Sequence, residues 1–498
     1  MSQVINTNVS ALNAQRQLLK SSNSMQTAMQ RLSSGLRINS ASDDAAGLAI
    51  ADRMTSQVKG LNQAVRNAND GISIAQVTEG ALGEITNALQ RMRELSVQSA
   101  NDTNTATDRA SLQKEVSQLQ QEITRIASQT EFNGKKLLDG TFTSQKIQIG
   151  AYADQTISFS IGNAKSTNIG SNSLTNTTGT SVEAQAAAAN YGALAATVAT
   201  QTLTVSGSLG TTDISVASGA TARTIASNIN NATATTGVSA TAVTKAQLTT
   251  LSAAGTVTFD LYGSNSSAVS ISANVASTSD LTTLADAINA KASSTGITAE
   301  LNGSRDAITL TSAEGYDIAL ADFTSSSAGA TIKMQGVNAD DGSLEGAAVT
   351  LTSTGNDTTR VGGTLMFNSS NTFTVTTDTA GTLFTAGAKA SSLSAVGSVN
   401  IGTQTGANSA IKSIDGALAF VDDLRATLGA MQNRFGSAIA NMQSTSQNIS
   451  AAKSRIYDAD FASETSELSR NQILQQAGTA MLAQANSSTQ NVLSLLRG

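Results

Sequence analysis

The stretch that decides the fold is residues 411–442, IKSIDGALAFVDDLRATLGAMQNRFGSAIANM. Its apolar side chains recur at steps of three or four residues, at Ile411, Ile414, Leu418, Val421, Leu424, Leu428, Met431, Phe435, Ile439 and Met442. This spacing places them on one face of a helix. Because the pattern lasts for several heptads, it predicts coiled-coil-like packing rather than an ordinary surface helix.

The N-terminal part of the chain repeats this periodicity in three shorter segments. Their apolar positions are Met25, Met29, Leu32 and Leu36, then Leu82, Ile85, Leu89 and Met92, then Leu112, Val116, Leu119, Ile123 and Ile126. Between the first two segments, residues 39–44 supply helix-capping and acidic residues just before Ala45. We therefore expect a linker near residues 37–45, followed by a new helix.

Strand-like alternation begins after the third helical segment. Ile147 and Ile149, then Ile157, Phe159 and Ile161, alternate with polar residues on either side of a short polar stretch, which predicts a β-hairpin. Farther on, the segment from about residue 175 to residue 403 consists mainly of Thr, Ser, Ala and Gly. The middle of the chain is therefore expected to be rich in strands.

An internal repeat lies within this middle zone. Residues 225–230 and 236–240 recur at a constant offset of 59 as residues 284–289 and 295–299. Each copy has the pattern of a short amphipathic helix that leads into a strand, and apolar alternation before each copy predicts a further strand. We expect two α+β modules and then a less regular β segment to about residue 403.

Composition excludes several classes of function. The chain has no Cys, His, Trp or Pro. Without Cys or His, thiolate catalysis, Ser-His-Asp triads and HExxH zinc sites cannot be built. The net charge of −6, with 13% charged residues, argues against nucleic-acid binding, and no apolar run is long enough for a membrane span. The sequence predicts no enzyme activity, no metal site and no cofactor.

Paired carboxylates are the remaining candidates for chemistry. Adjacent acids occur at residues 43–44, 340–341 and 422–423. Such pairs can catalyse glycoside hydrolysis only across a defined cleft, and capping or solvated roles suit them better. The start of the chain lacks the basic and apolar regions of a secretory signal peptide, so we do not expect one.

The two ends carry an unusual distribution of charge. Residues 471–496 have a helical pattern and no charged residue, and residues 1–40 have four basic residues and no acid. A helix without a charged outer face is expected to be covered on more than one side. We therefore expect both ends to be disordered in the monomer and to fold when copies associate. An intramolecular helical bundle fits the periodicity equally well, because it uses the same packing geometry.

At both ends the residues resemble the signature segments of bacterial flagellins. These segments are MSQVINTN at 1–8, RLSSGLRINSASDDAAG at 31–47, ANDGISIAQVTEGA at 68–81 and QNVLSLLR at 490–497. The resemblance covers about residues 1–175 and 404–498. The 59-residue repeat resembles an insertion motif that occurs in the middle region of many flagellins.

This resemblance implies a multi-domain α+β fold with long coiled-coil-like helices from both termini, a β-hairpin and a central α+β or β-rich variable region. Residues 1–40 with 458–498 would form an inner tube, and residues 45–175 with 404–457 a surrounding tube. Residues 176–403 would project outward and contain two repeats, at about 202–255 and 256–320.

The resemblance also implies a function and its partners. The chain would polymerise into the extracellular bacterial flagellar filament used for swimming. It would be exported unfolded by the flagellar type III apparatus, with a secretion chaperone, a filament cap and hook-junction proteins as partners. Host Toll-like receptor 5 and NAIP receptors would recognise it. Two alternatives are a hook–filament junction or cap protein and an adhesin that acts through the central region.

Candidate site residues carry over where the motifs match. The residues that match those recognised by Toll-like receptor 5 are Arg91, Leu95 and Glu115. Leu95 could equally be a core residue, and Arg91 and Glu115 could form an assembly contact. NAIP recognition falls on Leu493, Leu495 and Leu496, where the trailing Gly498 departs from flagellins that end in Arg. The residues expected to drive self-assembly are Leu32, Leu36, Ile473, Leu474, Met481 and Val492.

Overall fold

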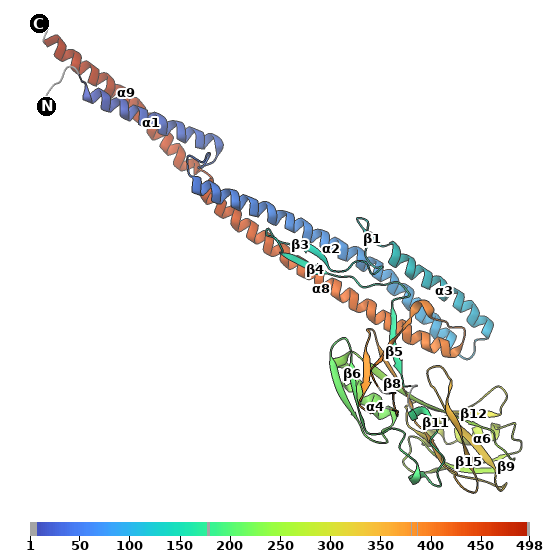
Figure 1. Cartoon of the computed structure of the whole chain (residues 1–498). Helices are drawn as coiled ribbons and strands as arrows, with labels where there is room; N and C mark the ends of the chain where they lie inside the picture. The colour runs from blue at the N-terminus through green and yellow to red at the C-terminus, as the bar shows by residue number, and fades with distance from the viewer. Residues whose placement is uncertain (1–6, 177–179, 380, 386, 496–498) are drawn as a thin grey trace. The chain divides into compact units, whose positions relative to one another are not determined.

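The computed structural model describes residues 7–176, 180–379, 381–385 and 387–495, with side chains as far as residue 488 (Figure 1). The chain forms two compact units. The first consists of Met1–Ala75, Ser144–Ser160 and Gly429–Gly498, and the second of Gln76–Thr143 and Ile161–Leu428. The three-domain division expected from the sequence stays a prediction.

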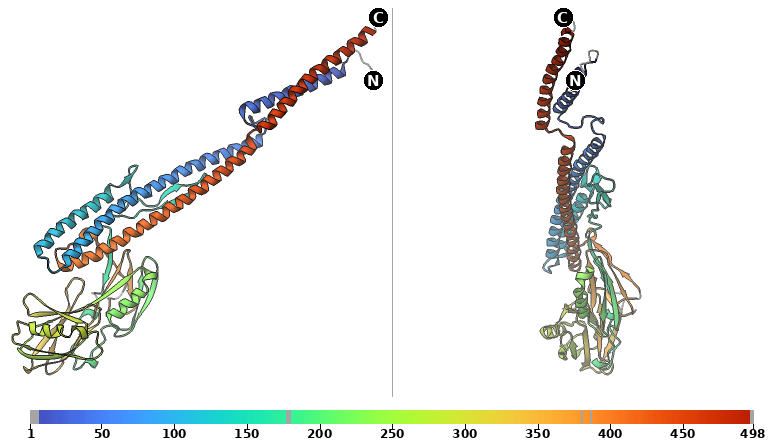
Figure 2. Two further views of the ribbon diagram at one scale, coloured as in Figure 1. Left: turned by 180° about the vertical axis from the view of Figure 1, so that it is seen from behind. Right: turned by 90° about the vertical axis from the view of Figure 1, so that its left-hand side faces the viewer.

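The first unit contains the two terminal helices, α1 (Val9–Ser34) and α9 (Phe461–Leu495). They lie side by side in antiparallel directions, in both views of Figure 2. The residues of α1 that face away from solvent recur at steps of three and four: Ala11, Ala14, Leu18, Ser21, Met25, Ala28 and Leu32. The periodicity seen in the sequence is therefore the stripe that meets α9.

A non-helical segment follows α1, as the sequence predicts. Gly35 ends the helix in a left-handed conformation with φ 72°. Leu36 then forms an isolated β-bridge with Asp458, and the Arg37 guanidinium donates to the Ile456 carbonyl oxygen. The next helix begins at Ala45, where the Asp44 carboxylate accepts a hydrogen bond from the Gly47 N–H at 2.8 Å.

Two long helices, α2 (Ala45–Ala100) and α8 (Gln404–Tyr457), contribute to both units. In the first unit they pack with the hairpin of β3 (Gln145–Gln148) and β4 (Thr156–Phe159), which pair as predicted. Phe435 is fully buried there and meets Phe159 edge-to-face at 6.2 Å between ring centroids. Gly71 makes room for the Phe435 ring, because a Cβ at this position would lie 2.9 Å from it.

In the second unit, α2 is paired with α3 (Ala106–Gln129) through Arg91 and Glu115, and with the N-terminal part of α8 through Arg93 and Asp415. The α3 helix begins with a capping box between Thr105 and Asp108. The apolar positions of the second sequence segment, from Leu82 to Met92, are fully buried. The helices predicted from periodicity are thus present, and the fold class expected from the sequence is confirmed.

The rest of the second unit is built mainly of strands. A small hairpin, β1 (Glu131–Phe132) and β2 (Lys135–Lys136), turns at Asn133–Gly134. The remaining elements are β5 (Gly170–Thr175), β6 (Gln201–Ser206), β7 (Thr211–Val216), α4 (Ala222–Asn231), α5 (Thr233–Thr236), β8 (Ser239–Thr249), β9 (Gly255–Tyr262), β10 (Val269–Val275), α6 (Thr282–Asn289), α7 (Ala292–Thr295), β11 (Ile297–Leu301), β12 (Ala307–Ser312), β13 (Ile318–Ser325), β14 (Thr331–Val337), β15 (Leu344–Thr352), β16 (Thr359–Val361), β17 (Thr364–Ser369), β18 (Thr374–Thr377), β19 (Lys389–Ala390) and β20 (Ser392–Ala395).

The 59-residue repeat corresponds to a contact between a helix and a strand that occurs twice. At the end of α4, the Asn230 side-chain amide donates to the Ala240 carbonyl oxygen and accepts from the Ala240 N–H, both at 2.8 Å. Asn289, at the end of α6, makes the same two bonds with Ala299 at the same lengths. Each asparagine therefore joins its helix to the strand that follows. Its side-chain amide bonds both the N–H and the C=O of one strand residue, as a neighbouring strand would. The two repeats are copies of one helix-to-strand unit.

The two repeats have separate hydrophobic cores but share a strand. The first core includes Ile225, Ile229 and Phe367. The second includes Phe259 and Phe323. The eleven-residue strand β8 contributes to both cores and pairs with β12, β14 and β17. Below, the first module means β6, β7 and α4, and the second module means β9, β10, α6 and β11–β13.

Candidate assembly surface

The contact between α1 and α9 is close along a narrow line. The Asn8 side-chain amide donates to the Ala485 carbonyl oxygen at 3.0 Å. Near the middle of α9, Gly478 faces Leu18, and a Cβ on Gly478 would lie 3.0 Å from the Leu18 Cγ. Small residues therefore let the two helices approach, and among the described side chains of the pair Ala28 is the one apolar residue that is fully buried.

An ion pair closes the other end of this contact. The Arg31 guanidinium lies 3.0 Å from the Glu464 carboxylate, whose side chain is 14% exposed. Glu464 stands in the first turn of α9, where the helix dipole also favours a negative charge. The cation-rich α1 thus meets the acidic start of α9, which fixes the register of the pair.

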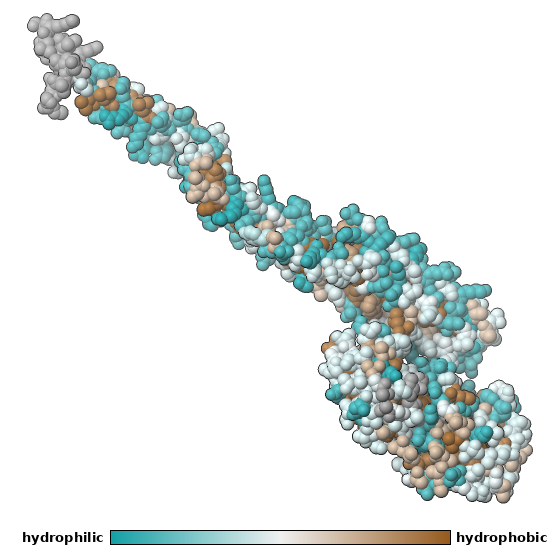
Figure 3. Space-filling model, in the orientation of Figure 1, coloured by the Kyte–Doolittle hydropathy of each residue, from teal (hydrophilic) through white to brown (hydrophobic). Residues whose placement is uncertain are grey.

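Much of the apolar surface of both helices remains uncovered. Figure 3 shows hydrophobic patches along the α1–α9 pair. Eight large side chains are between 48% and 65% exposed: Val9, Leu12, Leu19 and Met29 on α1, and Phe461, Ile473, Leu474 and Met481 on α9. So many large exposed apolar side chains on one pair of helices are typical of an interaction surface. We call these eight residues the terminal apolar surface.

A groove of about 600 Å³ lies between the two helices and adds a concave part to this surface. Leu474, Met481 and Ala477 line it together with Gly478. Lys20, Glu467 and Arg470 provide charged groups around the same groove. Its lining suits an amphipathic partner rather than a purely apolar one.

The residues predicted to drive self-assembly occupy different positions in the chain. Ile473, Leu474 and Met481 belong to the terminal apolar surface. Leu32 and Leu36 are half-buried within the chain, in the α1 stripe and in the β-bridge. The Val492 side chain lies outside the described residues. The sequence pattern could not separate inward from outward leucines, because a helix covered on several sides is apolar on all of them.

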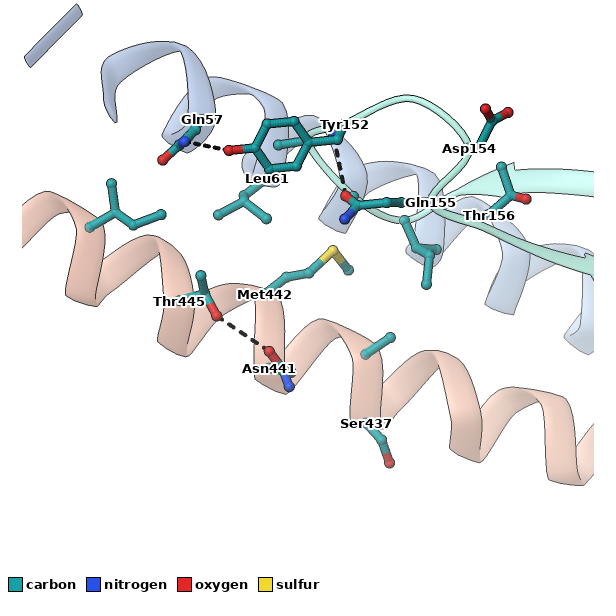
Figure 4. A pocket seen from close by; sticks show the side chains of 15 residues that line it. Gln57, Leu61, Tyr152, Asp154, Gln155, Thr156, Ser437, Asn441, Met442 and Thr445 are labelled. Atoms are coloured by element: carbon teal, nitrogen blue, oxygen red, sulfur yellow. Dashed lines mark hydrogen bonds between the residues drawn. The ribbon is translucent and has the colours of Figure 1, made fainter. Parts of the chain in front are cut away.

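A second groove, of about 720 Å³, lies in the first unit between α2, the hairpin turn and α8 (Figure 4). Leu61 and Met442 form part of its apolar lining. Tyr152 lines it on the α2 side, where its hydroxyl accepts a hydrogen bond from the Gln57 amide at 2.5 Å. Sequence reasoning missed this groove, because three segments far apart in the chain form it together.

Comparisons with known proteins match both ends of the chain. The model of the bacterial flagellin N-terminal helical region matches residues 5–143, and that of the C-terminal helical region matches residues 411–496. The flagellin hook IN motif matches twice, at residues 202–254 and 256–314. The B-type flagellin of Pseudomonas aeruginosa is 43% identical, and a flagellin of Salmonella typhimurium is 40% identical, each over the full length of both chains.

The chain belongs to the bacterial flagellin family. Among solved structures, it is similar to FliC from Burkholderia pseudomallei, with 20% identity and a TM-score of 0.29 over 73% of this chain and 99% of that chain. So low a TM-score adds nothing to the assignment, which rests on the sequence matches.

Membership of this family establishes the function. This flagellin is a structural subunit that polymerises into the extracellular filament of the bacterial flagellum and serves motility. The alternatives from the sequence, a hook–filament junction protein or an adhesin, are not favoured by these relatives.

The three candidate residues for Toll-like receptor 5 recognition differ in their exposure to solvent. The Arg91 guanidinium donates to the Glu115 carboxylate at 2.8 Å and to Glu94 at 2.9 Å. These hydrogen bonds, the one to Glu115 first, raise the pKa of Arg91. Leu95 is 1% exposed and packs in the core of the second unit. Arg91 and Glu115 are thus paired on the surface, whereas Leu95 is buried.

Other candidates from the sequence lie elsewhere. The side chains of Leu493 and Leu495, and the whole of Leu496, lie outside the described residues. Within the described ranges, no group of three or more His, Cys, Asp or Glu residues could hold a metal ion. Over the same ranges, no helix combines the length and the hydrophobicity that crossing a membrane requires.

Proposed function

We propose that the terminal apolar surface forms the contacts between subunits of the filament, and that α1 and α9 reach their full stability only in those contacts. The observation that carries this proposal is the set of eight large apolar side chains left about half exposed or more. Covering what remains of each is worth ~1 kcal/mol or more. Several copies packed around one subunit can supply that cover.

The same surface supports coupled folding and assembly. Ordering the backbone costs about 1–2 kcal/mol per residue, and the narrow α1–α9 contact buries little apolar surface in return. In the isolated chain the pair is therefore the least stable helical part of this flagellin. The long helices α2 and α8 bury large side chains such as Phe435 and Leu82 and remain folded without partners.

Limited proteolysis tests this difference. In soluble monomers, cleavage should occur within α1 and α9 well before α2 or α8 is cut, because the terminal pair opens most readily. In assembled filaments the same sites should resist cleavage. Termini that resist protease in the monomer as well as α2 and α8 do would contradict coupled folding.

Export of the chain before assembly is a further part of this proposal. We propose that the chain passes unfolded through the flagellar type III apparatus. The absence of Pro and Cys supports this, since neither slow prolyl isomerisation nor disulfide exchange delays refolding. A secretion chaperone that covers the C-terminal segment would keep the apolar residues of α9 from aggregating. Cap and hook-junction proteins would then guide folding at the growing end.

Recognition by host receptors is a further proposal. Arg91 and Glu115 form the exposed centre of the Toll-like receptor 5 patch, while Leu95 holds the α2 surface from below. Leu493, Leu495 and Leu496 form the segment for NAIP receptors. An exposed arginine paired with carboxylates is a frequent centre of binding energy at interfaces.

Substitution of Arg91 tests the receptor proposal. Arg91→Gln should weaken receptor activation by soluble monomer by on the order of tenfold, because the variant loses the charge at the centre of the patch. Arg125→Gln is a matched control, because Arg125 also forms an exposed ion pair, with Glu122 on α3. Equal activation by the Arg91 variant and the wild type would rule out this assignment.

We also propose that this flagellin has no catalytic activity. The lack of His and Cys supports this, since His is the commonest general base and Cys is a strong nucleophile. The adjacent acids at residues 340–341 are held in a turn, where the Ser343 hydroxyl and N–H donate to Asp341 and lower its pKa. Such a carboxylate caps a turn and is poorly suited to proton transfer near neutral pH.

A further inference from the structure

The turn between β12 and β13, residues 313–317, reaches from the second module to the first. It leaves the second module at Ser312 and returns to it at Ile318. Between these points it contacts α4 and β8, which supply the first module's core, and the loop before β6. The turn therefore joins the two modules, and its contacts lie outside the hydrophobic core of either module.

Arg223, near the start of α4, is bound to the turn in three ways. Its backbone N–H donates to the Gly315 carbonyl oxygen at 3.1 Å. Its guanidinium pairs with the Glu314 carboxylate and lies 4.9 Å from the centre of the Tyr316 ring. An ion pair and a cation–π contact on one side chain give the turn a defined position on α4.

Gly315 brings the turn close to β8. Its φ of +76° lies in the left-handed region. A Cβ at this position would lie 2.5 Å from the Cβ of Ala242. The turn can therefore rest on β8 only with glycine at its centre, which shows a fitted contact rather than a loose loop.

Asp317, at the end of the turn, is held against the loop before β6. Its Oδ2 accepts a hydrogen bond from the Thr197 hydroxyl at 3.0 Å. Among the residues that the structure describes, none donates a hydrogen bond to the buried Oδ1. Burial raises the pKa of Asp317 to about 6, although the Thr197 hydrogen bond and the charge of Arg360 both act to lower it. An ionised carboxylate in this position therefore carries a cost.

We propose that the β12–β13 turn is a latch between the two repeat modules, closed by Arg223 and weakened by ionisation of Asp317. When the latch opens, Asp317 reaches water and its charge is solvated. Arg360 on β16 is the charged group that acts on Asp317 from a neighbouring element. Glu314 and Tyr316 lie on the turn itself, and Arg223 on α4 contacts the turn through these two residues. The loop before β6 contributes Thr197.

The direction of the pH effect follows from the two states. Asp317 has a pKa of about 6 in the closed latch and an ordinary value, about 3.9, once exposed. The closed state therefore binds the proton more tightly, so acid favours closure. Between pH 8 and pH 5 the closing equilibrium should rise about tenfold. The window stops at pH 5 because exposed carboxylates begin to lose their charge below it.

Hydrogen exchange at position 223 in the full-length chain measures the latch directly, since this N–H donates across the module boundary to Gly315. Its protection factor, corrected for the intrinsic effect of pH, should be about tenfold higher at pH 5 than at pH 8 in the wild type. Asp317→Asn is the matched variant. It keeps the shape without the charge, so its protection should be high and constant over this range.

A second variant separates the latch from the stability of α4. Arg223→Gln removes the ion pair and the cation–π contact but keeps the backbone N–H, so protection at position 223 should fall severalfold at every pH. The N–H of Ile225 donates within the helix to the Thr221 carbonyl oxygen and should keep its protection. The latch is wrong if Arg223→Gln leaves position 223 protected, or if positions 223 and 225 lose protection together. A tenfold pH effect that persists in Asp317→Asn would overturn the role of Asp317.

Discussion

Ile473→Asp should abolish filament growth at concentrations where the wild type assembles. Ile473 is 65% exposed on α9 and belongs to the terminal apolar surface. In a filament it would be covered by another copy, and burying an unpaired carboxylate costs several kcal/mol. A loss of about 3 kcal/mol per subunit raises the critical concentration by more than 100-fold. Seeded growth, followed by sedimentation and electron microscopy, measures this concentration.

Two comparisons make this result specific to assembly. Ile473→Leu keeps the side chain apolar and should assemble within a few-fold of the wild-type concentration. Circular dichroism of the soluble Ile473→Asp chain should match the wild type, because the side chain is exposed in the monomer. Filaments of Ile473→Asp that grow at the wild-type critical concentration would show that this face of α9 does not meet another copy.

Phe435→Ala should lower the free energy of unfolding of the first unit by about 3–5 kcal/mol. The Phe435 ring is fully buried and packs against Phe159 and the open face of Gly71. Its removal leaves a cavity where α2, α8 and the hairpin meet, and a rigid helix pair cannot close such a cavity completely. Denaturant unfolding of soluble monomer measures the change.

A phenylalanine on the surface supplies the control for this substitution. Phe461 is 57% exposed at the start of α9. Phe461→Ala should change the stability of the monomer by less than about 1 kcal/mol, yet it should weaken filament growth. Phe435→Ala is expected to destabilise the monomer but to leave filament growth unchanged at temperatures where the variant stays folded. If both variants destabilise the monomer equally, Phe435 does not have the central packing role assigned to it.

The helices could be predicted because their signal is local. The run from Ile411 to Met442 places one apolar side chain in each turn, and a helix needs only that regularity to have a buried face. The junction before Ala45 was equally legible, because Asp44 caps the helix through its own side chain. The two repeats were visible because each is a short unit in which a helix ends at an asparagine and leads into a strand.

The sites could be predicted only in part. Arg91 and Glu115 were identified as members of one patch, and the structure places them in contact. The burial of Leu95 could not be read from its position, because a leucine in an apolar stripe has the same pattern whether it meets its own chain or another. The grooves beside Tyr152 and along α9 were missed for a related reason, since no single segment contains them.

The sequence by itself determined the helical ends, the hairpin, the doubled central motif and the family, because each depends on residues that are neighbours in the chain. Only the tertiary structure decided which apolar residues remain exposed on α1 and α9. Only it showed that β8 serves two cores and that the turn around Gly315 joins the two modules. These features depend on contacts between residues far apart in the chain, and such contacts leave no periodic pattern in either partner.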